Sequence, residues 1–94
     1  MEQPFASEIL MEAEYGHHGK VESTEVFSSY HGVILLKDGG SIHIQSQEGS
    51  PFVNHQTISR DGIDVAGGET DFTHVRDYKE YVDGILAEAA AVVR

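Results

Sequence analysis

Cysteine is absent from this sequence of 94 residues, and basic residues are few. Without cysteine the chain can form neither a disulfide nor a thiolate metal site, and it has no cysteine nucleophile. No stretch approaches the roughly 20 apolar residues of a membrane-spanning helix. The start "MEQPFASEIL" lacks the basic and apolar regions of a secretory signal. We therefore expect a cytoplasmic protein that does not enter a membrane.

Acidic residues dominate the charged composition, with 16 acidic against 6 basic residues and a formal net charge of −10. Charge of this sign repels nucleic acids and anionic membranes and attracts a basic protein surface. A solvated acidic surface that only keeps a small protein soluble explains the same composition. The composition therefore favours a basic protein partner over direct binding of nucleic acid.

The chain length is sufficient for a single domain, residues 1–94, with one modest core. Pro4 can open a short N-terminal helix, although the segment after it also alternates as a strand does. We favour the helix because Glu, Leu, Met and Ala are good helix formers. Its apolar face would hold Phe5, Ile9, Leu10 and Ala13. The glycines of "GHHGK" then predict a turn.

The middle of the chain carries the signals of β-hairpins. "GVILLKDGGSIHIQ" predicts a hairpin closed at residues 38–40, with His43 on the more polar face. "TISRDGIDV" predicts a second turn at residues 61–62, next to apolar contacts from Ile58, Ile63 and Val65. The segment "SQEGSPFVNHQ" between them is interpreted as a loop.

The C-terminal segment predicts a long amphipathic helix from about Asp71 to Val93. Its apolar residues recur at spacings of three and four: Phe72, Val75, Tyr78, Val82, Ile85, Leu86, Ala89 and Val93. Thr70, Asp71 or Thr73 can cap the helix, and Gly84 on its exposed side costs up to about 1 kcal/mol relative to alanine. The predicted fold class is α+β, a small antiparallel β-sheet of hairpins packed against this helix, with the short N-terminal helix.

The six histidines do not form a recognisable metal motif. No pair is spaced as in HExxH, and His17 and His18 are adjacent, so that their side chains tend to diverge. A site built from His17, His43 and His74 with a carboxylate has no support from spacing. The sequence also lacks GxSxG, Walker A and GxGxxG motifs. We therefore predict no enzymatic activity, no metal and no cofactor.

The outer face of the C-terminal helix is the candidate binding surface. A helical wheel places four acids and a tyrosine there: Asp77, Glu80, Tyr81, Asp83 and Glu88. The four acids lie between residues 77 and 88, which on a helix amounts to about one charge every 4 Å. This is close to the roughly 3.4 Å spacing of charges along one DNA strand. A salt-bridged solvated face is the alternative, because Arg76 can pair with Glu80, and Lys79 with Asp83.

Two segments resemble parts of proteins that belong to a known functional class. "KDGGSIHIQSQEG", followed by the helix "DYKEYVDGILAEA", resembles small acidic anti-CRISPR proteins encoded by phages. Some members of that group mimic the charge of DNA and occupy the nucleic-acid path of a CRISPR surveillance complex. The resemblance covers the C-terminal half and implies a non-enzymatic inhibitor from a phage or mobile element.

Three hypotheses follow from the sequence. The first is an acidic protein, a monomer or weak dimer, that blocks a basic nucleic-acid-binding surface through the helix face. The hairpins around His31 to Gln47 are the alternative contact surface for the same function. The second is a metal- or ligand-binding domain that uses His17, His18 and neighbouring acids. The third is a homo-oligomer that packs through the apolar tail from Ala87 to Val93.

Overall fold

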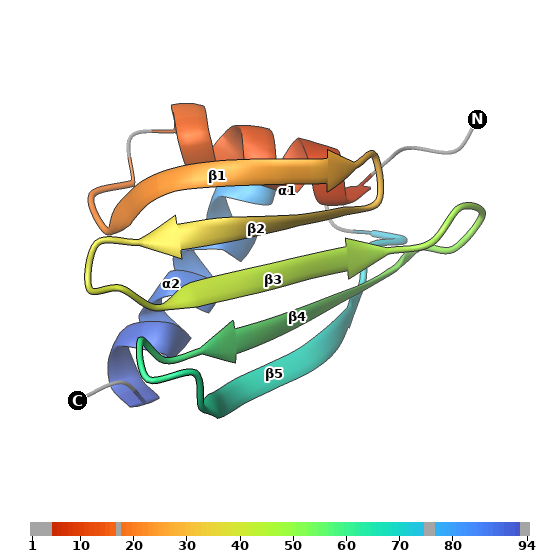
Figure 1. Cartoon of the computed structure of the whole chain (residues 1–94). Coiled ribbons are helices and arrows are strands. Elements are labelled where there is room, and N and C mark those ends of the chain that lie inside the picture. Colours follow the sequence, from red (N-terminus) through yellow and green to blue (C-terminus); the bar gives the residue numbers. More distant parts are fainter. Residues whose placement is uncertain (1–4, 17, 75–76, 93–94) are drawn as a thin grey trace.

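The fold is a two-layer α+β arrangement, as the sequence predicts (Figure 1). The computed structural model describes residues 5–16, 18–74 and 77–92. Five antiparallel strands form one sheet in which each strand lies beside the next in sequence. Two helices, α1 and α2, pack on one face of the sheet and leave the other face open. The elements are α1 (Phe5–Tyr15), β1 (Val21–Ser28), β2 (His31–Leu36), β3 (Ser41–Ser46), β4 (Phe52–Ile58), β5 (Asp64–Asp71) and α2 (Tyr78–Val92).

The core lies between the sheet and the two helices. Alternate residues of the central strands face the helices, and each fully buried aliphatic side chain contributes about 1.5–3 kcal/mol. Gly32 lets α1 pack closely on β2, because a Cβ at this position would lie 2.2 Å from Leu10 Cδ1. The most buried side chains include Ile9, Leu10, Ile34, Ile42, Ile44, Val53, Phe72 and Val82.

The N-terminal segment is helical, which confirms the helix that we favoured over a strand. Ile9, Leu10 and Ala13 are buried together on one side. The alternation typical of a strand would have placed Met11 and Tyr15 with Ile9 on one buried face. Both are instead exposed, at 55% and 69%. Pro4 and the side chain of Phe5 lie outside the described residues.

Both predicted turns are present. Asp38 Oδ1 accepts a hydrogen bond from Gly40 N at 2.8 Å, and Gly39 has a φ of 95°. Gly62 has a φ of 82° in the second turn. Such positive φ values strain residues with a Cβ and explain the glycines. The predicted apolar contact of Ile63 is wrong, because its side chain is 60% exposed at the turn.

The loop expected between the hairpins is wrong in its second half, where β4 begins at Phe52. Gly49 and Pro51 signal a turn, but the residues after them form a strand with two different faces. Val53 and Thr57 are buried, while Asn54 is exposed. A strand with a largely polar outer face gives little apolar signal in the sequence.

The C-terminal helix begins at Tyr78, which is later than predicted. Residues through Asp71 belong to β5, and Phe72 is buried in the core beyond the strand end. Phe72 continues the three- and four-residue spacing of the helix by coincidence. The predicted start of the helix was therefore too early. Asp77 caps the helix in place of the predicted residues, because its Oδ1 accepts a hydrogen bond from Glu80 N at 3.1 Å. Val75 and Val93, also predicted to be helical, lie outside the described residues.

In the described part of the chain, neither helix combines the length and apolar character needed to cross a membrane.

Candidate acidic interaction site

A groove runs between α2 and β5 on the helix side of the sheet. We call it the α2 groove. It contains four of the five residues predicted for the binding surface, the exception being Asp83. Its lining residues are His55, Thr70, His74, Asp77, Glu80, Tyr81, Gly84, Ile85 and Glu88.

Helix periodicity brings the acidic residues of the groove together. Glu80, Gly84 and Glu88 follow one another at intervals of four residues, which places them in one row along α2. A Cβ at Gly84 would meet nothing within 4 Å. The row therefore consists of two carboxylates with an open space between them, about 6 Å along the axis from each.

Asp77 has a structural role besides its charge. As the N-cap of α2 it satisfies a backbone N–H that has no partner within the helix. A negative charge at this end also interacts favourably with the helix dipole. The side chain remains exposed. Replacing Asp77 therefore alters the stability of α2 as well as the charge of the groove.

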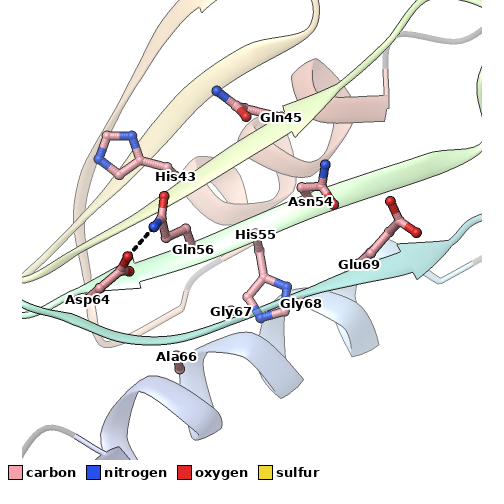
Figure 2. A pocket seen from close by; sticks show the side chains of 10 residues that line it. All are labelled: His43, Gln45, Asn54, His55, Gln56, Asp64, Ala66, Gly67, Gly68 and Glu69. Carbon is pink, nitrogen blue, oxygen red and sulfur yellow. Dashed lines mark hydrogen bonds between the residues drawn. The ribbon is translucent and has the colours of Figure 1, made fainter.

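Glu88 is held by a histidine from the sheet. His55 extends from β4 toward α2 (Figure 2), and its Nε2 lies 2.9 Å from Glu88 Oε1. The His55 side chain is only 9% exposed, whereas that of Glu88 is 43% exposed. The ring lies over Gly68, where a Cβ would be 3.4 Å from His55 Cε1. One oxygen of Glu88 is thus fixed in place while the carboxylate remains accessible.

Tyr81 forms part of the wall of the groove and does not protrude from it. Its ring packs edge-on against Phe72, with centroids 4.8 Å apart, and against His55 at 6.3 Å. Burial raises the pKa of the Tyr81 hydroxyl to about 12; the nearby Thr70 side chain opposes this shift, and the charge of Glu88 adds to it. The buried hydroxyl makes no well-formed hydrogen bond with any described residue. Tyr81 therefore stays neutral and stabilises the packing of α2.

Asp83 lies on another side of α2, toward the segment that follows α1. Its Oδ2 is 2.9 Å from Lys79 Nζ, and its Oδ1 is 2.9 Å from His18 Nδ1. The hydrogen bond from Lys79 holds the pKa of the Asp83 carboxyl below its usual value, and His18 acts in the same direction. The ion pair of Lys79 with Asp83 was the alternative expected for a solvated face. Arg76, the other proposed ion-pair partner, lies outside the described residues.

His18 joins the two helices. Its Nε2 lies 2.8 Å from Glu12 Oε2 in α1, its Nδ1 contacts Asp83 in α2, and the side chain is 4% exposed. Both ring nitrogens face carboxylate oxygens, and a ring nitrogen that carries a proton can donate a hydrogen bond to the oxygen it faces. The glycines around this histidine predict a turn, but no local pattern indicates its contact with both helices. A clue was Gly16, which lets Glu12 approach, because a Cβ there would lie 1.8 Å from Glu12 Oε2.

The remaining histidines do not converge on a metal-binding arrangement. His43 lies on the open face of the sheet, while His74 lines the α2 groove on the other side. The two acids at His18 contact opposite edges of its ring and share no coordination point. No group of three His, Asp or Glu side chains suited to a metal ion occurs among the described residues. His17 is outside them.

A second hollow occupies the open face of the sheet (Figure 2), and we call it the sheet-face hollow. Amide and carboxylate side chains dominate its lining, and Gln56 Nε2 donates to Asp64 Oδ2. Both hollows flank β5, one on each face of the sheet. The lining residues are His43, Gln45, Asn54, His55, Gln56, Asp64, Ala66, Gly67, Gly68 and Glu69.

Comparison with known proteins gives no relative: no protein-family model, curated protein or solved structure matches the chain.

Proposed function

We propose that this chain is a non-enzymatic, acidic interaction protein that inhibits a nucleic-acid-binding complex by occupying its basic surface. One observation supports this most: the acids that the sequence singled out as binding residues, except Asp83, line one groove. The resemblance to anti-CRISPR proteins implies that the target is a CRISPR-type complex and that the protein originates from a phage or mobile element. The site of action is then the cytoplasm.

The charge of the α2 groove supports a basic partner. Lysine and arginine are absent from its described lining residues, while three carboxylates border it. The space above Gly84 is wide enough to admit part of a side chain from outside. A lysine or arginine entering there would meet Glu80 on one side and Glu88 on the other. Charge-assisted hydrogen bonds of this kind contribute about 1.5–3 kcal/mol each.

The alanine-rich end of α2 supports a monomer or weak dimer. The exposed apolar side chains described there are Ala87, Ala90 and Ala91, which are small and bury little area against a second copy. A net charge of −10 adds repulsion between copies.

A DNA-displacement assay tests the proposed function. A purified CRISPR-type surveillance complex is incubated with its target DNA and increasing amounts of this protein, and bound DNA is followed by gel mobility. The wild-type protein is expected to displace the DNA. For the double variant Glu80→Gln/Glu88→Gln, the protein concentration that displaces half of the DNA should rise by about tenfold or more, because two charged contacts are lost.

A matched variant separates the groove from net charge. Glu22→Gln/Glu48→Gln removes the same charge from exposed positions on β1 and on the loop before β4. It should displace DNA as well as the wild type does. Equal loss in both double variants would show that overall charge acts and the groove does not. No displacement by the wild type would rule out this target.

A further inference from the structure

The two edges of the sheet differ in how well they are protected from pairing with another strand. The β1 ladder contains two register shifts, between Val21 and Ser23 and between Val26 and Ser28. Irregularities of this kind disrupt an edge. The pairing of β5 with β4 is continuous over six residue pairs, from Phe52↔Asp71 to Thr57↔Ala66, and its single register shift lies at the start of β5, between Thr57 and Ile58. Of the two edges, β5 is the more regular.

The hydrogen-bond pattern shows which backbone groups of β5 point outward. Phe72 N donates to Pro51 O at 2.8 Å, just beyond the end of the ladder. In an antiparallel pair, opposite residues alternate between bonded and non-bonded positions. The bonded positions of β5 are therefore Thr70, Gly68 and Ala66, and the alternate residues Gly67, Glu69 and Asp71 turn their N–H and C=O groups away from β4. No other strand of the described chain pairs with that edge.

The surroundings of this edge are acidic on both faces of the sheet. Asp64 and Glu69 lie in the sheet-face hollow, and Glu80 and Glu88 lie in the α2 groove. Figure 2 shows Asp64 and Glu69 on β5 beside the hollow. Neither hollow has a lysine or arginine among its described lining residues. Gly67 and Gly68 are exposed and carry no side chain that would hinder an approaching strand.

We propose that the β5 edge binds an extended basic segment of the partner as a sixth strand. The inference rests on the proposed function and specifies the chemistry of the partner. Backbone hydrogen bonds to Gly67, Glu69 and Asp71 supply affinity, and alternate side chains of the added strand reach the acids on either face. A second copy of this chain fits less well, because its own β5 would place like charges opposite one another.

Amide hydrogen exchange of the whole protein, followed by NMR, tests the proposal. The probe is a peptide of about ten residues that alternates arginine and valine, a pattern suited to a strand. Exchange of the Gly67, Glu69 and Asp71 amides should slow by about tenfold or more at saturation. Binding of the peptide without this protection would overturn strand addition while leaving the α2 groove as a site for basic groups. Protection along β1 instead would also overturn it.

Two control peptides separate charge from backbone pairing. Replacing each valine by proline keeps the charge and removes half of the backbone donors, so the peptide should bind weakly and protect no β5 amide. Replacing each arginine by glutamate should abolish binding. Equal binding of the proline and valine peptides would contradict strand addition. If neither basic peptide binds at all, both this inference and the basic partner of the proposed function fail.

A pair of variants at one position gives an independent test. Glu69→Gln removes the charge and keeps the outward N–H, whereas Glu69→Pro removes both. Proline is tolerated on an edge strand where the N–H faces solvent. We expect Glu69→Pro to bind the arginine–valine peptide about tenfold more weakly than Glu69→Gln. Equal affinities in two folded variants would contradict the inference, and the wild-type exchange experiment decides it if Glu69→Pro does not fold.

Discussion

His18 connects two helices that are far apart in sequence by placing a carboxylate against each ring nitrogen. A histidine at a turn would ordinarily be solvated, but this side chain is 4% exposed. Removing it would leave two carboxylates close together without the ring between them. Breaking such a buried polar contact costs the hydrogen bonds and also the desolvation of the groups that remain.

We expect His18→Ala to lower the free energy of unfolding by about 1–3 kcal/mol. Urea denaturation followed by circular dichroism measures the change. His43→Ala is the matched control, because His43 lies on the open face and should change stability by less than about 0.5 kcal/mol. Equal losses in the two variants would show that the contacts of His18 do not support the fold.

Replacing Gly84 should raise the stability of the protein, whereas replacing His18 should lower it. A Cβ there meets nothing, and its φ is not among the positive values. Gly84→Ala should therefore stabilise the protein by about 0.5–1 kcal/mol, since alanine favours the helix. Urea denaturation tests this, and an unchanged or lower stability would contradict it. The larger Gly84→Leu should fill the α2 groove and weaken binding of the arginine–valine peptide without altering charge.

The roles of individual residues were the least predictable part of the molecule. Asp77 was recognised as acidic, but its capping role depends on where α2 begins, and the spacing of Phe72 concealed this. Asp83 was grouped with the outer acids, although packing turns it toward His18, in the segment that follows α1. Such contacts depend on how the helices are oriented against each other, and no local sequence pattern encodes that orientation.

At the scale of the helix, Asp77 should contribute to both stability and binding. Asp77→Ala removes the cap and should lower the free energy of unfolding by about 1 kcal/mol. Asp77→Asn removes the charge but retains a capping oxygen, so its stability should stay within a few tenths of the wild type. Thermal melts of the two variants measure the difference. Similar losses in both would mean that charge and not capping stabilises α2.

Asp83 in α2 and Asp71 at the end of β5 should also make the protein sensitive to acid. Hydrogen bonds from Lys79 and from Thr73 hold the pKa values of Asp83 and Asp71, respectively, below the usual 3.8. As pH falls, the unfolded chain takes up these protons first. The stabilisation is therefore complete above the usual pKa and disappears as pH falls through the lower folded-state pKa.

The melting temperature should accordingly decrease between about pH 5 and about pH 2. In Asp83→Asn and Asp71→Asn the decrease should be smaller than in the wild type, because one titrating group is absent from each. Scanning calorimetry across this range measures the effect. If the melting temperature of the variants falls as far as that of the wild type, the two carboxyls do not have these roles.

For the molecule as a whole, the fold class was predictable because its main signals are local. The glycine turns at residues 39 and 62 and the apolar faces of the helices each determine a neighbouring element. Strand β4 was missed where its polar outer face hid the alternation. The α2 groove was predictable in part, since helix periodicity places Glu80 and Glu88 on one face. His55, which fixes Glu88, comes from a distant strand and could not be assigned from spacing.

The structural contacts of the acids on α2 also determine which substitutions can test their charge. Reversing Asp77, Glu80, Asp83 and Glu88 together to lysine would change every acid of the predicted binding surface at once. In the structure, this change would remove the helix cap and the contacts with His18 and His55. Replacement by asparagine or glutamine is the safer change, because amides keep an acceptor oxygen while removing the charge.

On the proposed function, the α2 groove, and not the overall charge, binds the basic partner. Calorimetric titration of the arginine–valine peptide from about 50 to about 300 mM salt separates these two possibilities. We predict that the wild type and Glu22→Gln/Glu48→Gln lose affinity steeply and equally with salt, while Glu80→Gln/Glu88→Gln binds weakly with a shallower dependence. Identical salt dependence in the two double variants would contradict the claim.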